Sequence, residues 1–137
     1  MGLRGKSMFV LDTNLLIEIE KGNEKIISLI QGLISKYPCK PVITAPTYSE
    51  FMYGYLQSSN KEEKAKEFLE AYDLLQTTKN SSLLFAKLKY NLMKKGKAIP
   101  LFDILVASIV MDRNATLLTM DTHFKNIEEL RTMIIES

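Results

Sequence analysis

The chain has 137 residues, of which 46% are hydrophobic and 25% are charged, and its formal net charge is +2. This size and composition fit one folded domain and exclude a disordered chain. No apolar run approaches the roughly 18 residues that cross a bilayer, and no signal-peptide core follows the polar start, so we expect a cytoplasmic protein without a membrane partner. We expect residues 1–7 to be a short N-terminal extension and residues 8–137 to be a single domain.

The chain contains one cysteine, Cys39, and one histidine, His123. These counts exclude an intramolecular disulfide and a zinc site built from cysteine and histidine. Cys39 is close to apolar residues and has no second histidine to activate it, which favours a packed thiol over a nucleophile. The weakly basic charge is compatible with a nucleic-acid partner but does not identify one.

The first half of the chain predicts a strand, then helices, then a strand. Residues 8–11 are apolar and end in Asp12, which indicates a strand buried on both faces and a turn into a helix. Apolar residues recur at helical spacing over residues 26–34, and residues 42–43 are typical of a second short strand. Residues 47–50 (Thr-Tyr-Ser-Glu) have the form of a capping box that opens another helix.

The second half of the chain continues this alternation. Apolar spacing and capping signals predict helices over residues 65–75, 81–92 and 100–111, and strands at residues 116–119 and 133–135. Asn80 and Ser81 are the expected caps of the second of these helices. Nearly every residue from 104 to 111 is apolar, so the third should lie flat on a sheet. Strands separated by helices predict an α/β fold, a three-layer sandwich with a short parallel sheet flanked by helices.

Four carboxylates are expected at the end of this sheet where α/β proteins bind ligands. Asp12 and Asp121 each follow a strand, Glu50 is near a helix start, and Asp103 is in the first turn of the apolar helix. Like charges at close range oppose each other's ionisation, and a cation resolves that conflict. Carboxylate oxygens favour hard ions, so Mg²⁺ or Mn²⁺ is the expected cofactor. The alternative is that each acid caps a helix, and for Glu50 the two interpretations are equally good.

At these acids the sequence resembles the PIN domain family, in particular the VapC-type toxins of toxin–antitoxin pairs. The resemblance begins at Phe9, and its motifs are Val10-Leu11-Asp12-Thr13-Asn14, Glu50 with Tyr53-Gly54, residues 99–107 and residues 118–124. It implies a PIN-like nuclease domain whose metal ligands are Asp12, Glu50, Asp103 and Asp121. It also implies that Asn14 and Thr119 orient ligands or the attacking water. Hydrogen bonding in a turn or at a strand end is the alternative for these two residues.

The resemblance implies a metal-dependent endoribonuclease that hydrolyses RNA phosphodiester bonds with water activated by the metal. Asp12 and Asp103 are expected to carry the main metal, and Glu50 and Asp121 to complete the site. The expected partners are an RNA substrate, a small antitoxin protein and a second copy of the chain. The alternatives are an RNA-processing nuclease of the same fold, an inactive RNA- or partner-binding module, and a phosphoaspartyl phosphatase. The last is disfavoured because Asn14 stands where that enzyme needs an acid.

Three further features have alternative interpretations. His123 follows a strand end, which favours capping or packing over catalysis, so it is not included in the catalytic set. Tyr48, Tyr53 and Tyr55 are expected to pack in the core, with base stacking or a subunit interface as alternatives. A basic stretch could bind RNA phosphates, but a solvated helix end is the favoured interpretation of its lysines. It consists of Lys87, Lys89, Lys94, Lys95 and Lys97.

Overall fold

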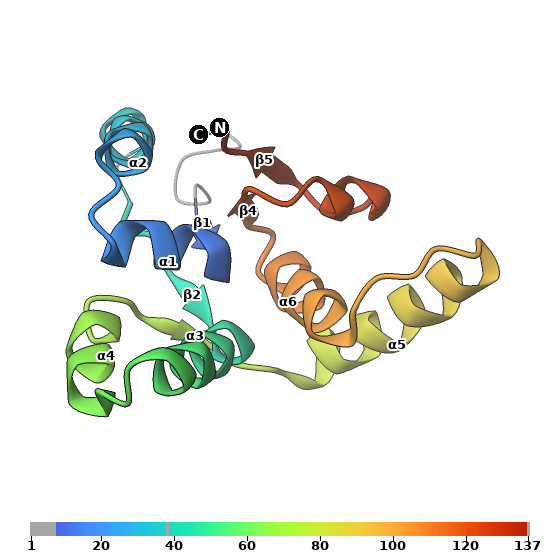
Figure 1. Ribbon diagram of the computed structural model, residues 1–137. Coiled ribbons are helices and arrows are strands. Elements are labelled where there is room, and N and C mark those ends of the chain that lie inside the picture. Colours follow the sequence, from blue (N-terminus) through green and yellow to red (C-terminus); the bar gives the residue numbers. More distant parts are fainter. Residues whose placement is uncertain (1–7, 38, 137) are drawn as a thin grey trace.

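The computed structural model describes residues 8–37 and 39–136 (Figure 1). The predicted N-terminal extension, residues 1–7, lies outside this range. None of the described helices is long and apolar enough to cross a membrane. In chain order the elements are β1 (Phe9–Leu11), α1 (Thr13–Glu20), α2 (Glu24–Lys36), β2 (Ile43–Thr44), α3 (Ala45–Ser58), α4 (Glu62–Leu69), β3 (Leu74–Leu75), α5 (Lys79–Lys94), α6 (Leu101–Asp112), β4 (Thr116–Thr119), the 3-10 helix η1 (Thr122–Asn126) and β5 (Thr132–Ile134).

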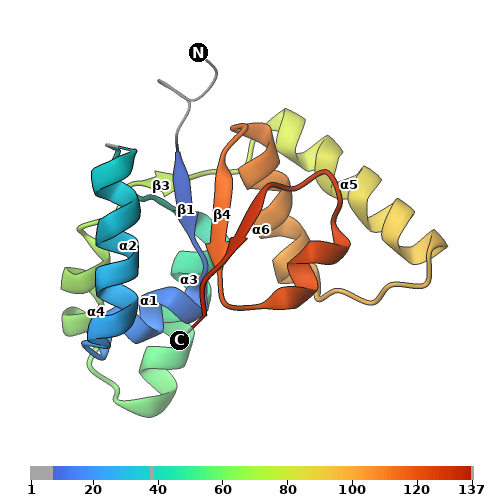
Figure 2. The same ribbon diagram turned by 90° about the horizontal axis from the view of Figure 1, so that it is seen from above.

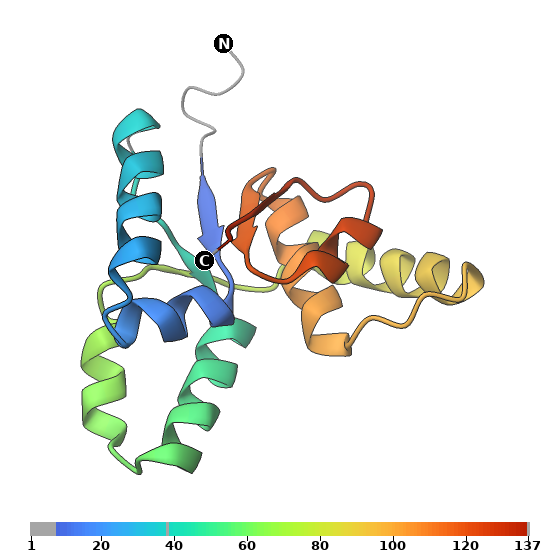
Figure 3. The same cartoon turned by 45° about the horizontal axis from the view of Figure 1, so that its top comes forward.

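The strands pair in parallel, as predicted. β4 lies between β1 and β5, with Val10 beside Leu117 in the β1–β4 register, and β2 pairs with β3. Two main-chain hydrogen bonds of 2.9 Å join the β2–β3 pair to β1: the Leu11 N–H donates to the Val42 carbonyl, and the Val42 N–H donates to the Phe9 carbonyl. The carboxyl ends of the strands therefore point in one direction, and β1 runs directly into α1 (Figure 3).

Side-chain alternation along the strands separates two apolar cores. Val10 and Leu117 pack with α5 and α6, whereas Leu11 and Leu118 pack with α1 to α4. Figure 2 shows α1 and α2 on one side of β1 and β4, and α5 and α6 on the other. The predicted three-layer α/β sandwich is confirmed, and its two cores hold the strand ends from both sides.

The helix predicted over residues 65–75 is wrong in its last part. α4 ends at Leu69, and the following chain forms β3. The spacing of apolar residues fits a helix, but the Ile43 N–H donates to the Asp73 carbonyl at 3.1 Å, and Leu75 is buried in the core beside α5 and α6. Pairing with a distant strand therefore outweighs the local periodicity.

The start of α3 also differs from the prediction. Thr44 is its N-cap and accepts a hydrogen bond from the Thr47 N–H at 3.2 Å. Glu50 consequently lies in the second turn, beyond the positions that a capping box uses. The capping interpretation of Glu50 is wrong, so another contact must account for the position of its carboxylate.

The N-cap of α5 lies two residues before the predicted Asn80, and the predicted Ser81 does take part in the cap. Thr78 is the N-cap, and its side chain and that of Ser81 form a reciprocal capping box. Asn80 does not cap the helix; its amide donates to the Asp112 carboxylate at 2.7 Å. This bond and a second one from Thr78 tie the start of α5 to the end of α6.

The two-core arrangement predicts that Leu118→Ala strongly destabilises the fold. Leu118 is 1% exposed at the centre of the sheet, so truncation should lower the free energy of unfolding by about 2–5 kcal/mol through lost burial and the cavity left behind. Leu83→Ala is the control because Leu83 is 53% exposed on α5, and it should change the free energy by less than about 0.5 kcal/mol. Urea unfolding measures both, and equal effects would contradict the arrangement.

Candidate active site

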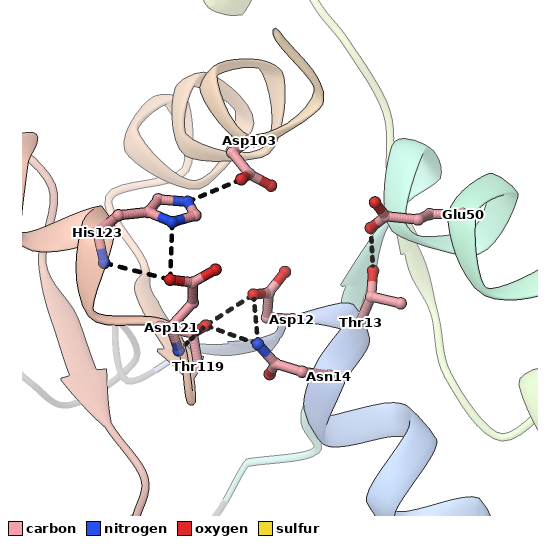
Figure 4. A network of polar contacts seen from close by, with 8 residues as sticks. All are labelled: Asp12, Thr13, Asn14, Glu50, Asp103, Thr119, Asp121 and His123. Carbon is pink, nitrogen blue, oxygen red and sulfur yellow. Dashed lines mark hydrogen bonds and ion pairs between the residues drawn. The ribbon is translucent and has the colours of Figure 1, made fainter. Parts of the chain in front are cut away.

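Asp12 stands where β1 passes into α1. Its N–H donates to the Leu118 carbonyl at 3.0 Å, which extends the β1–β4 pairing by one residue. Its carboxylate is buried and makes no cap hydrogen bond to α1. Instead, its Oδ2 accepts hydrogen bonds from the Thr119 hydroxyl at 2.6 Å and the Asn14 amide at 3.3 Å (Figure 4). The helix-capping alternative therefore does not explain Asp12.

Thr119 and Asn14 link the end of β4 to the start of α1. The Thr119 hydroxyl accepts from the Asn14 amide at 3.4 Å and from the Asp121 N–H at 3.0 Å. The Asn14 side-chain oxygen accepts from the Met120 N–H at 3.2 Å. Both residues thus make the strand-end bonds of the alternative interpretation, and the same contacts fix the orientation of Asp12.

His123 lies between Asp103 on α6 and Asp121 at the end of β4. Its Nε2 is 2.8 Å from Asp103 Oδ2, and its Nδ1 is 2.7 Å from Asp121 Oδ1. A neutral ring donates through one nitrogen, and an imidazolium donates through both. Asp121 Oδ1 also accepts from the His123 main-chain N–H at 3.3 Å, which caps η1. The capping side chain is therefore that of Asp121; His123 supplies only its main-chain N–H to the cap, and its ring contacts two of the predicted site acids.

Glu50 faces this group from α3. Its Oε1 accepts a hydrogen bond of 2.5 Å from the Thr13 hydroxyl, 37 residues away in sequence (Figure 4). Thr13 is absent from the predicted site residues. The signal that points to it is its position between Asp12 and Asn14, at the start of the helix that follows β1 at the carboxyl end of the sheet.

A cleft of about 420 Å³ collects the four predicted acids, and Thr13, Asn14, Ile17, Tyr53 and Gly54 complete its lining. Each acid uses one oxygen in the contacts described above. The second oxygen of each acid lies outside those side-chain contacts, and in Figure 4 these oxygens face the space between α1, α3 and α6. They are Asp12 Oδ1, Glu50 Oε2, Asp103 Oδ1 and Asp121 Oδ2.

Burial and like charge both act on these carboxylates. Burial raises the pKa of Asp12 to about 6, and the nearby Asp103 and Glu50 add to this effect, against the opposing hydrogen bond from Thr119. Burial also raises the pKa of Asp103, and the His123 contact opposes it. No lysine or arginine of the described chain lines the cleft. The cleft therefore concentrates carboxylate charge that no lysine or arginine of its described lining offsets.

The donor set fits a hard divalent cation. Asp103, Asp121 and His123 each offer one ligand atom, and these three atoms lie within 4.8 Å of one another. Asp12 and Glu50 are outside this group but line the same cleft as the two aspartates. Carboxylate oxygens are the donors that Mg²⁺ and Mn²⁺ prefer, and a bound cation offsets the repulsion that burial intensifies.

The predicted basic stretch is not part of the cleft. None of its five lysines lines the acidic site, and Lys89, Lys94 and Lys97 border apolar hollows beside α5. Core packing is the wrong prediction for Tyr53, which is 64% exposed and lines the cleft. The half-buried Tyr48, Tyr55 and Cys39 pack against the core of α1 to α4; for Cys39 this is the packed thiol expected from the sequence.

The PIN domain family model matches residues 9–130. A protein of Haemophilus influenzae named ribonuclease VapC1 is 30% identical over 129 residues, which cover 90% of this chain and 95% of that protein. Ribonuclease VapC2 of Rickettsia felis is 25% identical over 134 residues, which cover 95% and 97%. Among solved structures, VapBC-1 of nontypeable Haemophilus influenzae matches with a TM-score of 0.80 and 25% identity, over 93% of this chain and 97% of that chain. VapBC2 of Rickettsia felis, bound to a DNA fragment from its promoter, matches with a TM-score of 0.82 and 24% identity, over 94% and 99%.

The raised pKa of Asp12 predicts that the metal-free protein loses stability as the pH rises from about 4 to about 6. Between the ordinary pKa of 3.8 and the folded value of about 6, the folded state retains a proton that the unfolded state has released. The free energy of unfolding therefore falls as the pH rises through this window, by about 3 kcal/mol between its two ends.

Asp12→Asn cannot ionise, so it should lose most of this pH dependence. Asp73→Asn, at an exposed position outside the cleft, is the control and should keep the wild-type slope. Urea unfolding in EDTA across this pH range measures the effect, and a slope that survives in Asp12→Asn would contradict the assignment.

Proposed function

This chain belongs to the PIN domain family, and on that premise we propose that it is a metal-dependent endoribonuclease that hydrolyses RNA phosphodiester bonds. The observation that carries the proposal is the set of four carboxylates that line a single cleft, each with one oxygen outside the side-chain contacts that hold it. Mg²⁺ or Mn²⁺ is the proposed cofactor, held by Asp12, Glu50, Asp103 and Asp121. When bound, such an ion lowers the pKa of water and offsets negative charge on the phosphate.

The neighbouring side chains support this chemistry by holding the acids. Thr119 and Asn14 fix Asp12, and Thr13 fixes Glu50 on the opposite wall of the cleft. The exposed ring of Tyr53 at the rim offers a surface on which an RNA base can stack. In this proposal the chain positions the scissile phosphate and the attacking water between the acids, and residues 8–137 form the nuclease domain.

We further propose that the protein is the toxin of a toxin–antitoxin pair and acts on RNA in the cytoplasm. The relatives named ribonuclease VapC and the similarity to solved VapBC structures support this proposal. A small antitoxin would lay a helix or an extended tail across the acidic cleft. An arginine among the carboxylates would neutralise them by paired charge where the metal otherwise does.

An RNA-processing nuclease and an inactive binding module remain the alternative functions within this fold. The test is to incubate the purified protein with total cellular RNA in the presence of Mn²⁺, Mg²⁺ or EDTA. Discrete metal-dependent cuts would exclude the inactive module, and mapping the new 5′ ends would identify the substrate. A short upstream gene for a DNA-binding protein would favour the toxin over the processing enzyme. The phosphatase alternative has no support in the geometry, because Asn14 binds Asp12 and Thr119 and supplies no acid.

Asp103→Asn should reduce RNA cleavage below detection, because it keeps the side-chain shape but removes one anionic ligand. In EDTA the mutant should melt at a higher temperature than the wild type, because one repelling charge is gone. With saturating Mn²⁺ the order should reverse, because ligand at 100 times its Kd stabilises the wild type by about 2.7 kcal/mol, and the mutant forfeits part of this. Asp73→Asn is the control for both measurements. Metal-dependent cleavage by a well-folded Asp103→Asn protein would refute the site.

The partner proposals predict a homodimer that also binds an antitoxin. α3 presents Tyr53 and Leu56 as exposed apolar side chains near Glu50, which a subunit or antitoxin contact would cover. Light scattering coupled to gel filtration should give twice the chain mass of 15.6 kDa for the isolated protein. Purification from the native host should recover a small bound protein. A strictly monomeric chain would contradict the first expectation, and the absence of any co-purifying protein would contradict the second.

A further inference from the structure

His123 is the chain's single histidine, and the proposed function gives its ring no role. We propose that His123 is a positioning residue that holds Asp103 and Asp121 so that one oxygen of each faces the cleft. The inference rests on the proposed metal site and adds to it the group that sets the direction of two of its acids.

One rigid ring connects acids from two separate elements. Asp103 belongs to α6 and Asp121 follows β4, and the ring nitrogens lie 2.8 and 2.7 Å from one oxygen of each (Figure 4). Because His123 occupies Asp103 Oδ2 and Asp121 Oδ1, the other oxygen of each carboxylate is the one left toward the cleft. The ring thus determines which oxygen of each acid is available to a cation.

Direct coordination by His123 fits these contacts less well. Both ring nitrogens point at a carboxylate oxygen less than 3 Å away. A metal–nitrogen bond along the same direction is about 2.1 Å long, so the ion would collide with that oxygen unless the acid moved. The positioning role requires no such movement.

The ring is itself held in place. Its centroid lies 4.9 Å from that of Phe124, a fully buried residue of the core beside α5 and α6. The His123 N–H is bound to Asp121 in the η1 cap. Outer groups whose own orientation is fixed in this way typically change metal affinity 10- to 100-fold when they are removed.

Three substitutions at His123 separate the contacts. His123→Phe keeps a ring against Phe124 and removes both nitrogens. His123→Gln places an amide nitrogen near the position of Nε2, so it can keep the contact with Asp103. His123→Asn places an amide nitrogen near the position of Nδ1, so it can keep the contact with Asp121. Lys125→Gln is the control, because it removes a positive charge from an exposed position of the same 3-10 helix without touching the acids.

Mn²⁺ binding to each purified variant is measured by calorimetry without RNA. We expect His123→Phe to weaken Mn²⁺ binding about 10- to 100-fold, the two amide variants to lie between it and the wild type, and Lys125→Gln to stay within about twofold. Thermal unfolding in EDTA confirms that each variant is folded. If His123→Phe does not fold, weakened binding by either amide variant supports the proposal, and wild-type affinity in both overturns it.

Two results for a folded His123→Phe protein would overturn the proposal. Unchanged Mn²⁺ affinity would mean that the ring only packs, and tighter binding would mean that it acts as a competing positive charge. Failure of the proposed function is seen separately, as wild-type protein that binds Mn²⁺ but cleaves no RNA. In that case the Mn²⁺ affinities still decide whether His123 positions the acids.

Discussion

Repulsion among four carboxylates in a partly buried cleft lowers the stability of the fold, and the surrounding structure has to offset this cost. Burial raises the pKa of Asp12 and Asp103, which means that ionising them costs folding free energy when no cation is present. The two apolar cores on either side of β1 and β4 offset that cost, because they hold the strand ends and the start of α6 in place. The stable sandwich thereby supports a locally unfavourable site.

Hydrogen bonds from several different elements hold the four acids in place. Thr119 at the end of β4 holds Asp12, Thr13 at the start of α1 holds Glu50, and His123 on η1 contacts the remaining two. Each contact uses only one oxygen of a carboxylate. The arrangement fixes direction before any ligand arrives, so little reorganisation is needed when charge develops at the site.

The parts of the fold that local sequence determines were predictable, and the parts that depend on distant pairing were not. The strand before Asp12 and the apolar helix after Pro100 carry strong local patterns, and both are present. β3 lies in a segment whose spacing fits a helix, and only its pairing with β2 makes it a strand. The contacts of Glu50 with Thr13 and of His123 with Asp103 join residues 37 and 20 positions apart, which periodicity cannot reveal.

The composition of the cleft wall has a consequence for RNA binding. Among the described residues, the lining offers Ile17 and Tyr53 for contact with bases but no lysine or arginine for phosphates. A polyanion approaching four carboxylates is repelled unless their charge is neutralised first. In the proposed enzyme the cation is therefore needed for RNA to enter the site as well as for the chemistry. The same reasoning explains how an arginine from a partner protein would exclude substrate, since it would neutralise the acids while occupying the place that the phosphate needs.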